Sequence, residues 1–173
     1  MERYRYKSPI GPLLLTATSQ GINRLEFLEE DDPRIDEKFP EPKNRHLKQV
    51  IEQLDAYFAK KLTTFSCPID ATGTDFQQQV WQALTHISFG STSSYGAVAT
   101  TIGRSKASRA VGGANNRNPV PVIVPCHRVI GSDRKLVGYA GQLWRKRWLL
   151  EHEGIALKSP STSTTIKSSK FSL

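Results

Sequence analysis

The sequence predicts a mixed α/β (α+β) fold, in which a small unit of strands and one helix precedes a mostly helical unit. Three observations support this prediction. Short segments rich in strand-forming residues lie within residues 4–28, apolar residues recur at every third or fourth position over residues 45–60, and the composition changes across the threonine-rich residues 63–74. We therefore divide the 173 residues into a scaffold domain (1–73), a second domain (74–157) and a tail (158–173).

The first unit has the pattern of an antiparallel meander followed by a helix. Strands are expected over residues 4–7, 13–18 and 22–28, because turn-forming Pro, Gly and Ser residues separate these segments. Residues 29–42 are acidic and contain several prolines, which is typical of a loop. The helix is expected over residues 45–60. Since the unit shows no nucleophile paired with a base, we expect it to be a scaffold.

The second unit begins with a helix and continues as a helix-turn-helix. Thr74 or Asp75 is the expected N-cap of the first helix. A short helix over residues 95–102, a turn over 103–105 and a helix over 106–115 form the helix-turn-helix pattern. The buried stripe of the first helix is expected to consist of Val80, Trp81, Leu84 and Ile87.

A last helix is expected over residues 143–153, followed by a tail of low complexity. The tail from Lys158 is rich in Ser, Thr and Lys and is expected to be disordered. On the helix, we expect an inward apolar face and a largely outward basic face. The inward residues would be Leu143, Trp148, Leu149 and Leu150, and the outward residues would be Arg145, Lys146 and Arg147.

A candidate nucleophile follows the apolar, β-branched segment 120–124, which predicts a buried strand ending at Pro125. A free cysteine has a pKa of about 8.5, so a neighbouring base or a helix N-terminus must raise the thiolate fraction of Cys126. His127 is adjacent, and the chain must turn sharply after Pro125 for the two side chains to act together. A Cys-His dipeptide alone also fits a structural cysteine beside a surface histidine.

The second helix of the helix-turn-helix has an unusually small face, formed by the sequence ASRAVGGA at residues 107–114. Glycine inside a helix costs about 1 kcal/mol relative to alanine, so Gly112 and Gly113 need a reason. An ordinary helix is about 10–12 Å across and the minor groove of B-DNA is about 6 Å wide, so a thinned helix could enter a widened groove. Close packing of helices inside the protein would use small residues equally well.

Charge and cysteine content indicate the kind of partner and the cellular compartment of the protein. The formal net charge of +8 suits a polyanionic partner, although it does not require one. The two cysteines, Cys67 and Cys126, lack the paired spacing of zinc sites, and such thiols are expected in a reducing compartment. The apolar run near the N-terminus is too short for a signal peptide or a membrane span. We therefore expect a soluble intracellular protein without membrane contact.

Residues 74–154 resemble the catalytic domain of O6-alkylguanine-DNA alkyltransferases. The matching segments, in order, are FQQQVWQAL (76–84), SYGAVA (94–99), SRAVGGANNRNPVPVIVPCHRVIG (108–131), GYAG (138–141) and WLLEHEG (148–154). The resemblance implies a ribonuclease-H-like first domain and a suicide transfer of one alkyl group from O6 of guanine, and also from O4 of thymine, to Cys126. It implies a monomer that acts on double-stranded DNA containing O6-alkylguanine without cofactor or metal. The expected location is the cytoplasm, on the nucleoid of a bacterium, or the nucleus of a eukaryote.

The same resemblance assigns the reactive residues. In the family, a relay runs from the cysteine through a water to a histidine held by a glutamate, and Cys126, His127 and Glu153 match these positions. Asn118 matches an asparagine that ties the helix-turn to the active-site segment, and it completes the catalytic set.

Residues for DNA and for the alkylated base are assigned in the same way. Arg109 matches an arginine that fills the space of the flipped base, and Tyr95 matches a tyrosine that crowds the neighbouring phosphate and donates to guanine N3. The carbonyls of Cys126 and Val129 would accept from the guanine amine. Tyr139 would wall the pocket beside Gly141, and Ala140 would face O6 and leave room for larger alkyl groups. The other expected DNA-binding residues are Ser108, Ala110, Gly112, Gly113, Arg117 and Arg128.

Two other functions fit parts of the sequence. A cysteine hydrolase would also use Cys126 and His127, but it would turn over and would not need DNA. A non-catalytic helix-turn-helix DNA-binding protein would read the major groove, and the small face of residues 107–114 disfavours that.

Overall fold

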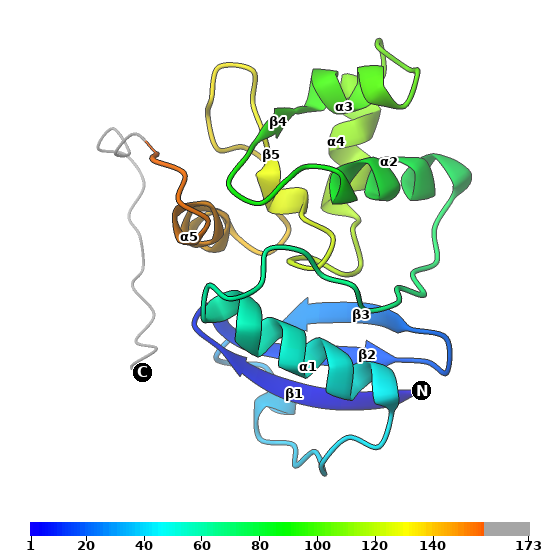
Figure 1. The fold of residues 1–173 in the computed structure, drawn as a ribbon, viewed down its shortest axis with the longest axis vertical. Coiled ribbons are helices and arrows are strands. Elements are labelled where there is room, and N and C mark those ends of the chain that lie inside the picture. The colour runs from blue at the N-terminus through cyan, green and yellow to red at the C-terminus, as the bar shows by residue number, and fades with distance from the viewer. Residues whose placement is uncertain (158–173) are drawn as a thin grey trace.

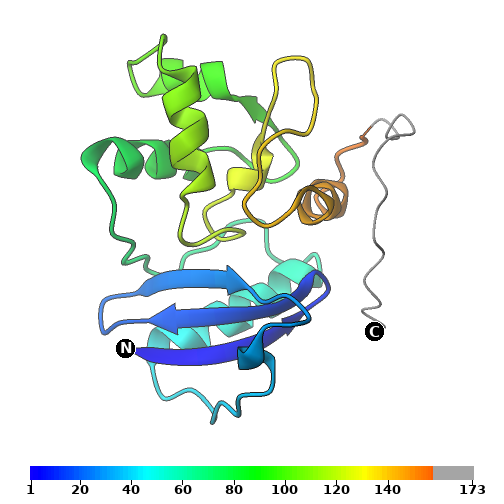
Figure 2. The same cartoon turned by 180° about the vertical axis from the view of Figure 1, so that it is seen from behind.

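The computed structural model describes residues 1–157, so the expected disorder of the tail 158–173 lies outside the described residues. The first unit is a three-stranded antiparallel sheet in the order β1 (Glu2–Ser8), β2 (Gly11–Ala17), β3 (Ile22–Phe27). Helix α1 (Arg45–Phe58) runs along one face of this sheet (Figure 1), and the view from behind places the strands in front of it (Figure 2). The expected meander and helix are confirmed.

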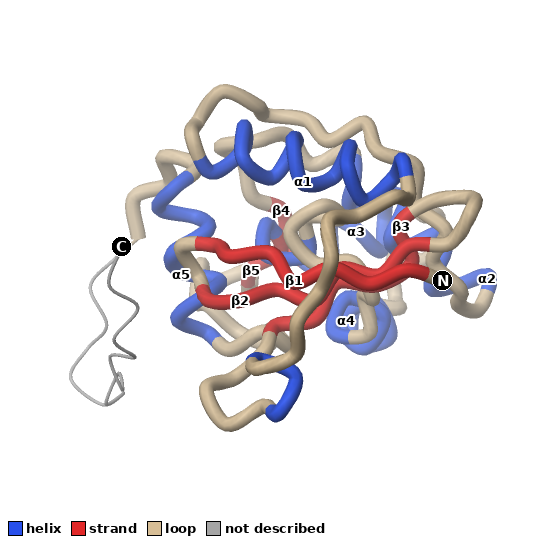
Figure 3. The backbone as a smooth tube through the Cα atoms, turned by 90° about the horizontal axis from the view of Figure 1, so that it is seen from below, coloured by secondary structure: helices blue, strands red, loops and turns tan. Residues whose placement is uncertain are grey.

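Local sequence explains these elements. Asn44 caps α1, because its side-chain oxygen accepts hydrogen bonds from the N–H groups of His46 and Leu47. The acidic segment after β3 is a loop that contains one short 3-10 helix, η1 (Pro33–Ile35). Apolar residues of β2 and of α1 are buried in one cluster. Figure 3 shows from below how α1 runs along the strands.

The second unit contains the expected helices. They are α2 (Asp75–Thr85), α3 (Tyr95–Thr101), α4 (Ser108–Asn116) and α5 (Leu143–His152). Thr74 caps α2 in a reciprocal capping box with Gln77. Two short strands, β4 (Ser93–Ser94) and β5 (Val129–Ile130), pair in parallel and place the start of α3 beside the active-site segment. No helix within residues 1–157 is long and apolar enough to span a membrane.

The two units share one hydrophobic core. The outer edge of β3 is bonded to other segments: the Leu25 N–H donates to the Pro119 carbonyl at 2.8 Å, and the Ile22 N–H donates to the Pro68 carbonyl at 2.8 Å. Buried residues of the sheet, α1, α2, α4 and the 120–129 segment form one continuous cluster. The active-site segment is therefore braced directly by the first unit.

The predicted strand over residues 120–124 is wrong. The segment is buried, but it forms a turn in which the Val124 N–H donates to the Val120 carbonyl at 3.0 Å. Val122 has a φ of 74°, a left-handed conformation that β-branched residues rarely adopt. Prolines at 119, 121 and 125 lack N–H donors and cannot form a strand ladder.

The expected outward basic face of α5 is also wrong. Arg145 and Lys146 are among the most buried side chains of the described residues, whereas Leu143, expected inward, is 45% exposed. The reason is that both side chains find hydrogen-bond acceptors in the protein interior. Arg145 donates to the Ile10 carbonyl and to Glu29, and its guanidinium lies 4.8 Å from the ring centroids of both Phe27 and Trp144.

Candidate active site

A 3-10 turn, η2 (Cys126–Arg128), carries the candidate nucleophile and its neighbours. The Cys126 N–H donates to the Val124 carbonyl at 2.8 Å, and the Arg128 N–H donates to the Pro125 carbonyl at 3.0 Å. Asn118 stabilises the approach to this turn: its amide donates to the Val124 carbonyl at 2.8 Å and its oxygen accepts from the Val120 N–H at 3.0 Å. This is the tie between the end of the helix-turn-helix and the active-site segment that the sequence predicted.

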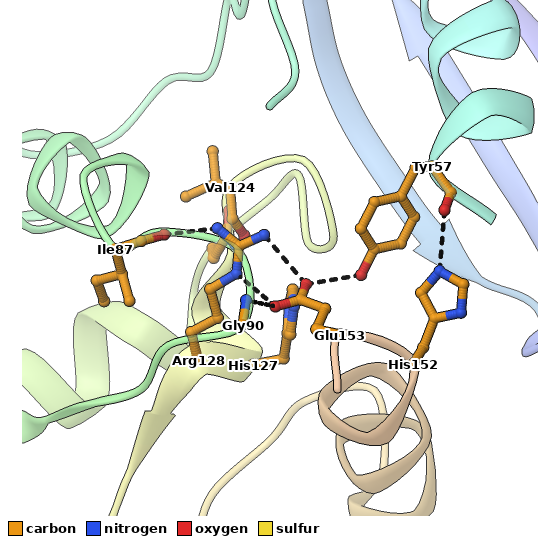
Figure 4. Close-up of polar contacts among 9 residues, drawn as sticks. Tyr57, Ile87, Gly90, Val124, His127, Arg128, His152 and Glu153 are labelled. Carbon is orange, nitrogen blue, oxygen red and sulfur yellow. Dashed lines mark hydrogen bonds and ion pairs between the residues drawn. The ribbon is translucent and has the colours of Figure 1, made fainter. Parts of the chain in front are cut away.

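Glu153, immediately after α5, is the centre of a buried polar cluster (Figure 4). Its Oε1 accepts from His127 Nε2 at 2.7 Å, and Arg128 donates to both carboxylate oxygens, at 2.9 and 3.0 Å. The Gly90 N–H donates to Oε2 at 3.3 Å. Burial alone raises the pKa of Glu153, but the hydrogen bonds from His127 and Arg128 and the positive charge of Arg128 outweigh it and hold this pKa at about 2.

Arg128 belongs to this cluster and not to the DNA-binding surface expected for it. Its side chain is 5% exposed, its third donor group bonds the Ile87 carbonyl at 2.6 Å, and its guanidinium lies over the ring of Phe89. A guanidinium that donates to a buried carboxylate in this way cannot reach a phosphate without breaking its buried ion pair with Glu153. The expected role of Arg128 as a DNA contact is therefore wrong.

His127 is held in one orientation and is neutral. Its ring is fully buried, and burial lowers its pKa despite the opposing effect of Glu153. In the neutral ring, Nε2–H donates to Glu153, so Nδ1 is the acceptor nitrogen. Nδ1 is buried and has no hydrogen-bond partner among residues 1–157. Nδ1, the ring nitrogen that does not bond the carboxylate, can therefore accept a proton.

Cys126 is a neutral thiol at rest. Burial raises its pKa to about 11, although the Asn118 side chain and the charge of Lys146 act in the lowering direction. The expectation that a neighbouring group raises the resting thiolate fraction is therefore not met. A reaction at this thiol therefore needs a proton acceptor, and the unpaired Nδ1 of the next residue, His127, is a candidate for that role.

A cavity of about 300 Å³ opens at Cys126. The expected pocket residues Tyr139, Ala140 and Gly141 line it, together with Phe27 of β3. A side chain at Gly141 would place its Cβ 2.4 Å from the Phe27 ring, so this position requires glycine. The buried Tyr139 hydroxyl has no partner within residues 1–157 and is a free polar group beside the cavity.

Two other residues expected to contact the guanine base, Val129 and Tyr95, do not line this cavity. The Val129 carbonyl accepts from Lys146 Nζ at 2.5 Å, and Lys146 also donates to the Val137 carbonyl at 2.8 Å. The Tyr95 hydroxyl donates to the same Val137 carbonyl at 3.1 Å. Lys146 therefore joins the 131–141 loop to Val129, the residue after the active-site turn, and Tyr95 joins the same loop to α3. The sequence did not predict this role for Lys146.

The small face of α4 is partly open: Gly112 and Gly113 are half-buried, whereas Ala114 is buried. Cβ atoms added at Gly112 and Gly113 would meet only the Tyr95 ring at 3.8 Å and the tip of Arg117 at 3.3 Å. Packing therefore does not require glycine at residue 112, which argues against the alternative of close helix packing. Arg109, in the first turn of α4, is exposed and makes no hydrogen bond or ion pair with any described residue. Ser108 is half-buried, and Ala110 and Arg117 are exposed near the same face.

Comparison with known proteins agrees with this geometry. The family model described as 6-O-methylguanine DNA methyltransferase, DNA binding domain, matches residues 75–155, and the model of the ribonuclease-like domain of the same family matches residues 3–71. The chain belongs to the 6-O-methylguanine DNA methyltransferase family. The ribonuclease-like first domain expected from the sequence is thereby confirmed.

Relatives of the methyltransferase family cover most of this chain. A methylated-DNA--protein-cysteine methyltransferase of Mycobacterium leprae is 48% identical over 84% of this chain and 88% of its own length. One from Methanosarcina barkeri is 47% identical over 85% and 93%. The crystal structure of the Mycobacterium tuberculosis methyltransferase in complex with DNA has a TM-score of 0.78 at 46% identity, covering 88% of this chain and 92% of that one.

Sequence reasoning missed one further member of the cluster. Tyr57, at the end of α1, donates its hydroxyl hydrogen bond to Glu153 Oε1 at 2.8 Å across 96 residues of sequence. Nothing near Tyr57 in the sequence indicates this contact, because Tyr57 also lies in the apolar stripe of α1. The only available signal was a polar hydroxyl at a fully buried position, which usually finds a partner.

Proposed function

We propose that this protein repairs DNA by one irreversible transfer of an alkyl group from O6 of guanine to Cys126. The observation that carries the proposal is the buried arrangement of Cys126, His127 and Glu153 beside an open cavity, behind a helix-turn-helix with a small exposed face. Membership of the methyltransferase family supports the same conclusion. We further propose that the protein acts as a monomer and also accepts O4-alkylthymine.

The proposed reaction uses His127 as the base. As Sγ of Cys126 attacks the alkyl carbon, the thiol proton passes to Nδ1 of His127, directly or through one water, and the charge of Glu153 stabilises the imidazolium that forms. The C–O6 bond breaks with its electron pair going to guanine, which takes up the proton that the thiol lost. The products are a thioether and guanine, and because the thioether does not hydrolyse, each molecule reacts once.

The alkylated base must leave the duplex to reach a cavity of this depth. Extrusion costs a few kcal/mol of stacking, and a side chain that enters the vacated space offsets part of this cost. Arg109 is suited to this role because it projects from the exposed first turn of α4, beside the small face that we propose enters the minor groove. Arg117 would contact a phosphate near the end of the same helix.

Replacing Gly112 by alanine is expected to move stability and DNA affinity in opposite directions. The added methyl group has room, so the helix should gain up to about 1 kcal/mol of stability from its better propensity. The same methyl group thickens the face proposed to enter the groove, so DNA affinity should fall. Denaturant unfolding and fluorescence titration of a duplex measure the two effects. Gly96→Ala on α3, where a Cβ would also fit, is the control; unchanged affinity in Gly112→Ala would remove this face from the interface.

Locating the transferred group tests the proposed function. The protein is incubated with a duplex oligonucleotide containing O6-methylguanine, digested, and the mass of each cysteine peptide is measured. The Cys126 peptide should gain the mass of one CH2 group and the Cys67 peptide should not. Burial raises both thiol pKa values to about 11, so the difference must come from the base and cavity at Cys126. Methylation of Cys67, or of neither cysteine, would refute the proposal.

A further inference from the structure

Tyr57 brings the first domain into contact with the proposed relay. Its side chain is fully buried at the end of α1, and its hydroxyl donates to Oε1 of Glu153, the same oxygen that accepts from His127 (Figure 4). Arg128 Nη2 is a third donor to Oε1 at 3.0 Å. One carboxylate oxygen thus serves the catalytic histidine, the ion pair and a tyrosine from the other domain.

Both domains fix the Tyr57 ring in place. Its centroid lies 5.3 Å from that of Phe65 in the first domain and 6.1 Å from that of Phe89 in the loop after α2. On α5, the ring of His152 lies 5.1 Å away, and His152 Nε2 is 2.9 Å from the Tyr57 carbonyl oxygen. A ring held on several sides gives its hydroxyl one position, and this position is on Glu153.

We propose that Tyr57 is a positioning residue for alkyl transfer: its hydroxyl fixes Oε1 of Glu153 against His127 and shares the negative charge of that oxygen. The inference rests on the proposed function and extends it, since the reactive machinery then includes the ribonuclease-like domain. Loss of the hydroxyl should loosen the carboxylate and slow proton transfer to His127, because misplacement of a catalytic group is costly.

The charges around the relay give the sign of a pH effect. Glu153 favours the protonated form of His127, whereas Arg128 and Lys146 disfavour it. The charge of Lys146 also acts to lower the pKa of Cys126, and the His152 ring of α5 lies 5.1 Å from the Tyr57 ring. Burial and the charge of Glu153 raise the pKa of Tyr57, so its hydroxyl remains a donor. Without that donor, Oε1 presents more charge to His127, and the pKa of His127 rises.

Single-turnover kinetics of Tyr57→Phe test the proposal, with free O6-benzylguanine as the substrate so that DNA binding is not measured. The amplitude of the reaction reports the folded, active fraction, and the rate constant reports the relay. We expect the rate constant to fall by about tenfold, the effect of one hydrogen bond to a charged group. The midpoint of the acidic limb of the pH-rate profile should move to higher pH.

Tyr6→Phe is a matched control. The Tyr6 hydroxyl donates to the Asp55 carboxylate at 2.7 Å, and Asp55 lies on α1 like Tyr57, but this pair does not touch the relay. Whatever its amplitude, the control should keep the parent rate constant and pH midpoint. A parent rate constant in Tyr57→Phe, a fall by the same factor at every pH, or an equal fall in Tyr6→Phe would overturn the positioning role. Absence of transfer by the parent protein would instead refute the proposed function.

Discussion

His127→Ala is expected to slow alkyl transfer by about 10²- to 10⁴-fold, the usual contribution of a general base. The effect should be large because the resting thiol is neutral, with a pKa raised by burial to about 11, and few molecules hold a thiolate without help. Truncation to alanine removes Nδ1, the ring nitrogen of His127 that does not bond Glu153 and that has no partner within residues 1–157. Arg128 still neutralises the carboxylate, so the fold should persist.

The measurement is the single-turnover rate with duplex substrate over about pH 5 to 9, because burial lowers the pKa of His127 from the ordinary histidine value of about 6.5. Glu153→Gln should also react slowly, because an amide cannot stabilise the imidazolium as a carboxylate does. DNA affinity should remain near the parent value in both variants, since neither side chain is exposed. Parent rates in both variants would show that neither residue belongs to the relay.

Arg109→Ala is expected to reduce repair of duplex DNA markedly while leaving the reaction with free O6-benzylguanine unchanged. If the guanidinium replaces the extruded base, the variant loses part of the few kcal/mol that offset unstacking. The free base has no stack to leave. Both rates are measured, the duplex rate at saturating DNA, so that weaker binding does not contribute.

Arg117→Ala is the matched control for Arg109, since it removes an exposed cation at the other end of α4. Loss of a phosphate contact should mainly weaken DNA binding and lower the slope of log affinity against log salt concentration by about one unit. If Arg109→Ala behaves in this way only, its intercalating role is wrong. Equal losses on duplex and free base would mean that Arg109 supports the fold.

Local signals in the sequence account for most of the fold. The strands of the first domain and the helices begin and end within a few residues of the predicted positions, because the turn at residues 9–10 and the caps at Asn44 and Thr74 are encoded locally. Cys126, His127 and Glu153 were assigned through motif resemblance, and the hydrogen bond between His127 and Glu153 has the geometry that the relay requires. Their catalytic roles stay predictions until the variants are measured.

The misassigned residues depend on partners that are distant in sequence. The sequence predicted exposed positions for Arg128 and Arg145. In the structure, Arg128 donates to Glu153 and Ile87. Arg145 donates to Glu29 and Ile10. The segment 120–124 had the composition of a strand, but its prolines and the side chain of Asn118 direct its hydrogen bonds into a turn. The periodicity of apolar residues indicates which positions are buried, but it does not indicate which buried polar groups form hydrogen bonds with one another.

The number of guanines repaired per protein molecule tests the central claim most directly. Parent protein is mixed with a large excess of duplex containing O6-methylguanine, and unmodified guanine is counted at completion. A thioether at Cys126 cannot be released by water, so the count should stop at one per active molecule, and Cys126→Ala should give none. A count that keeps rising with time would mean turnover, as for a hydrolase, and would contradict the single irreversible transfer.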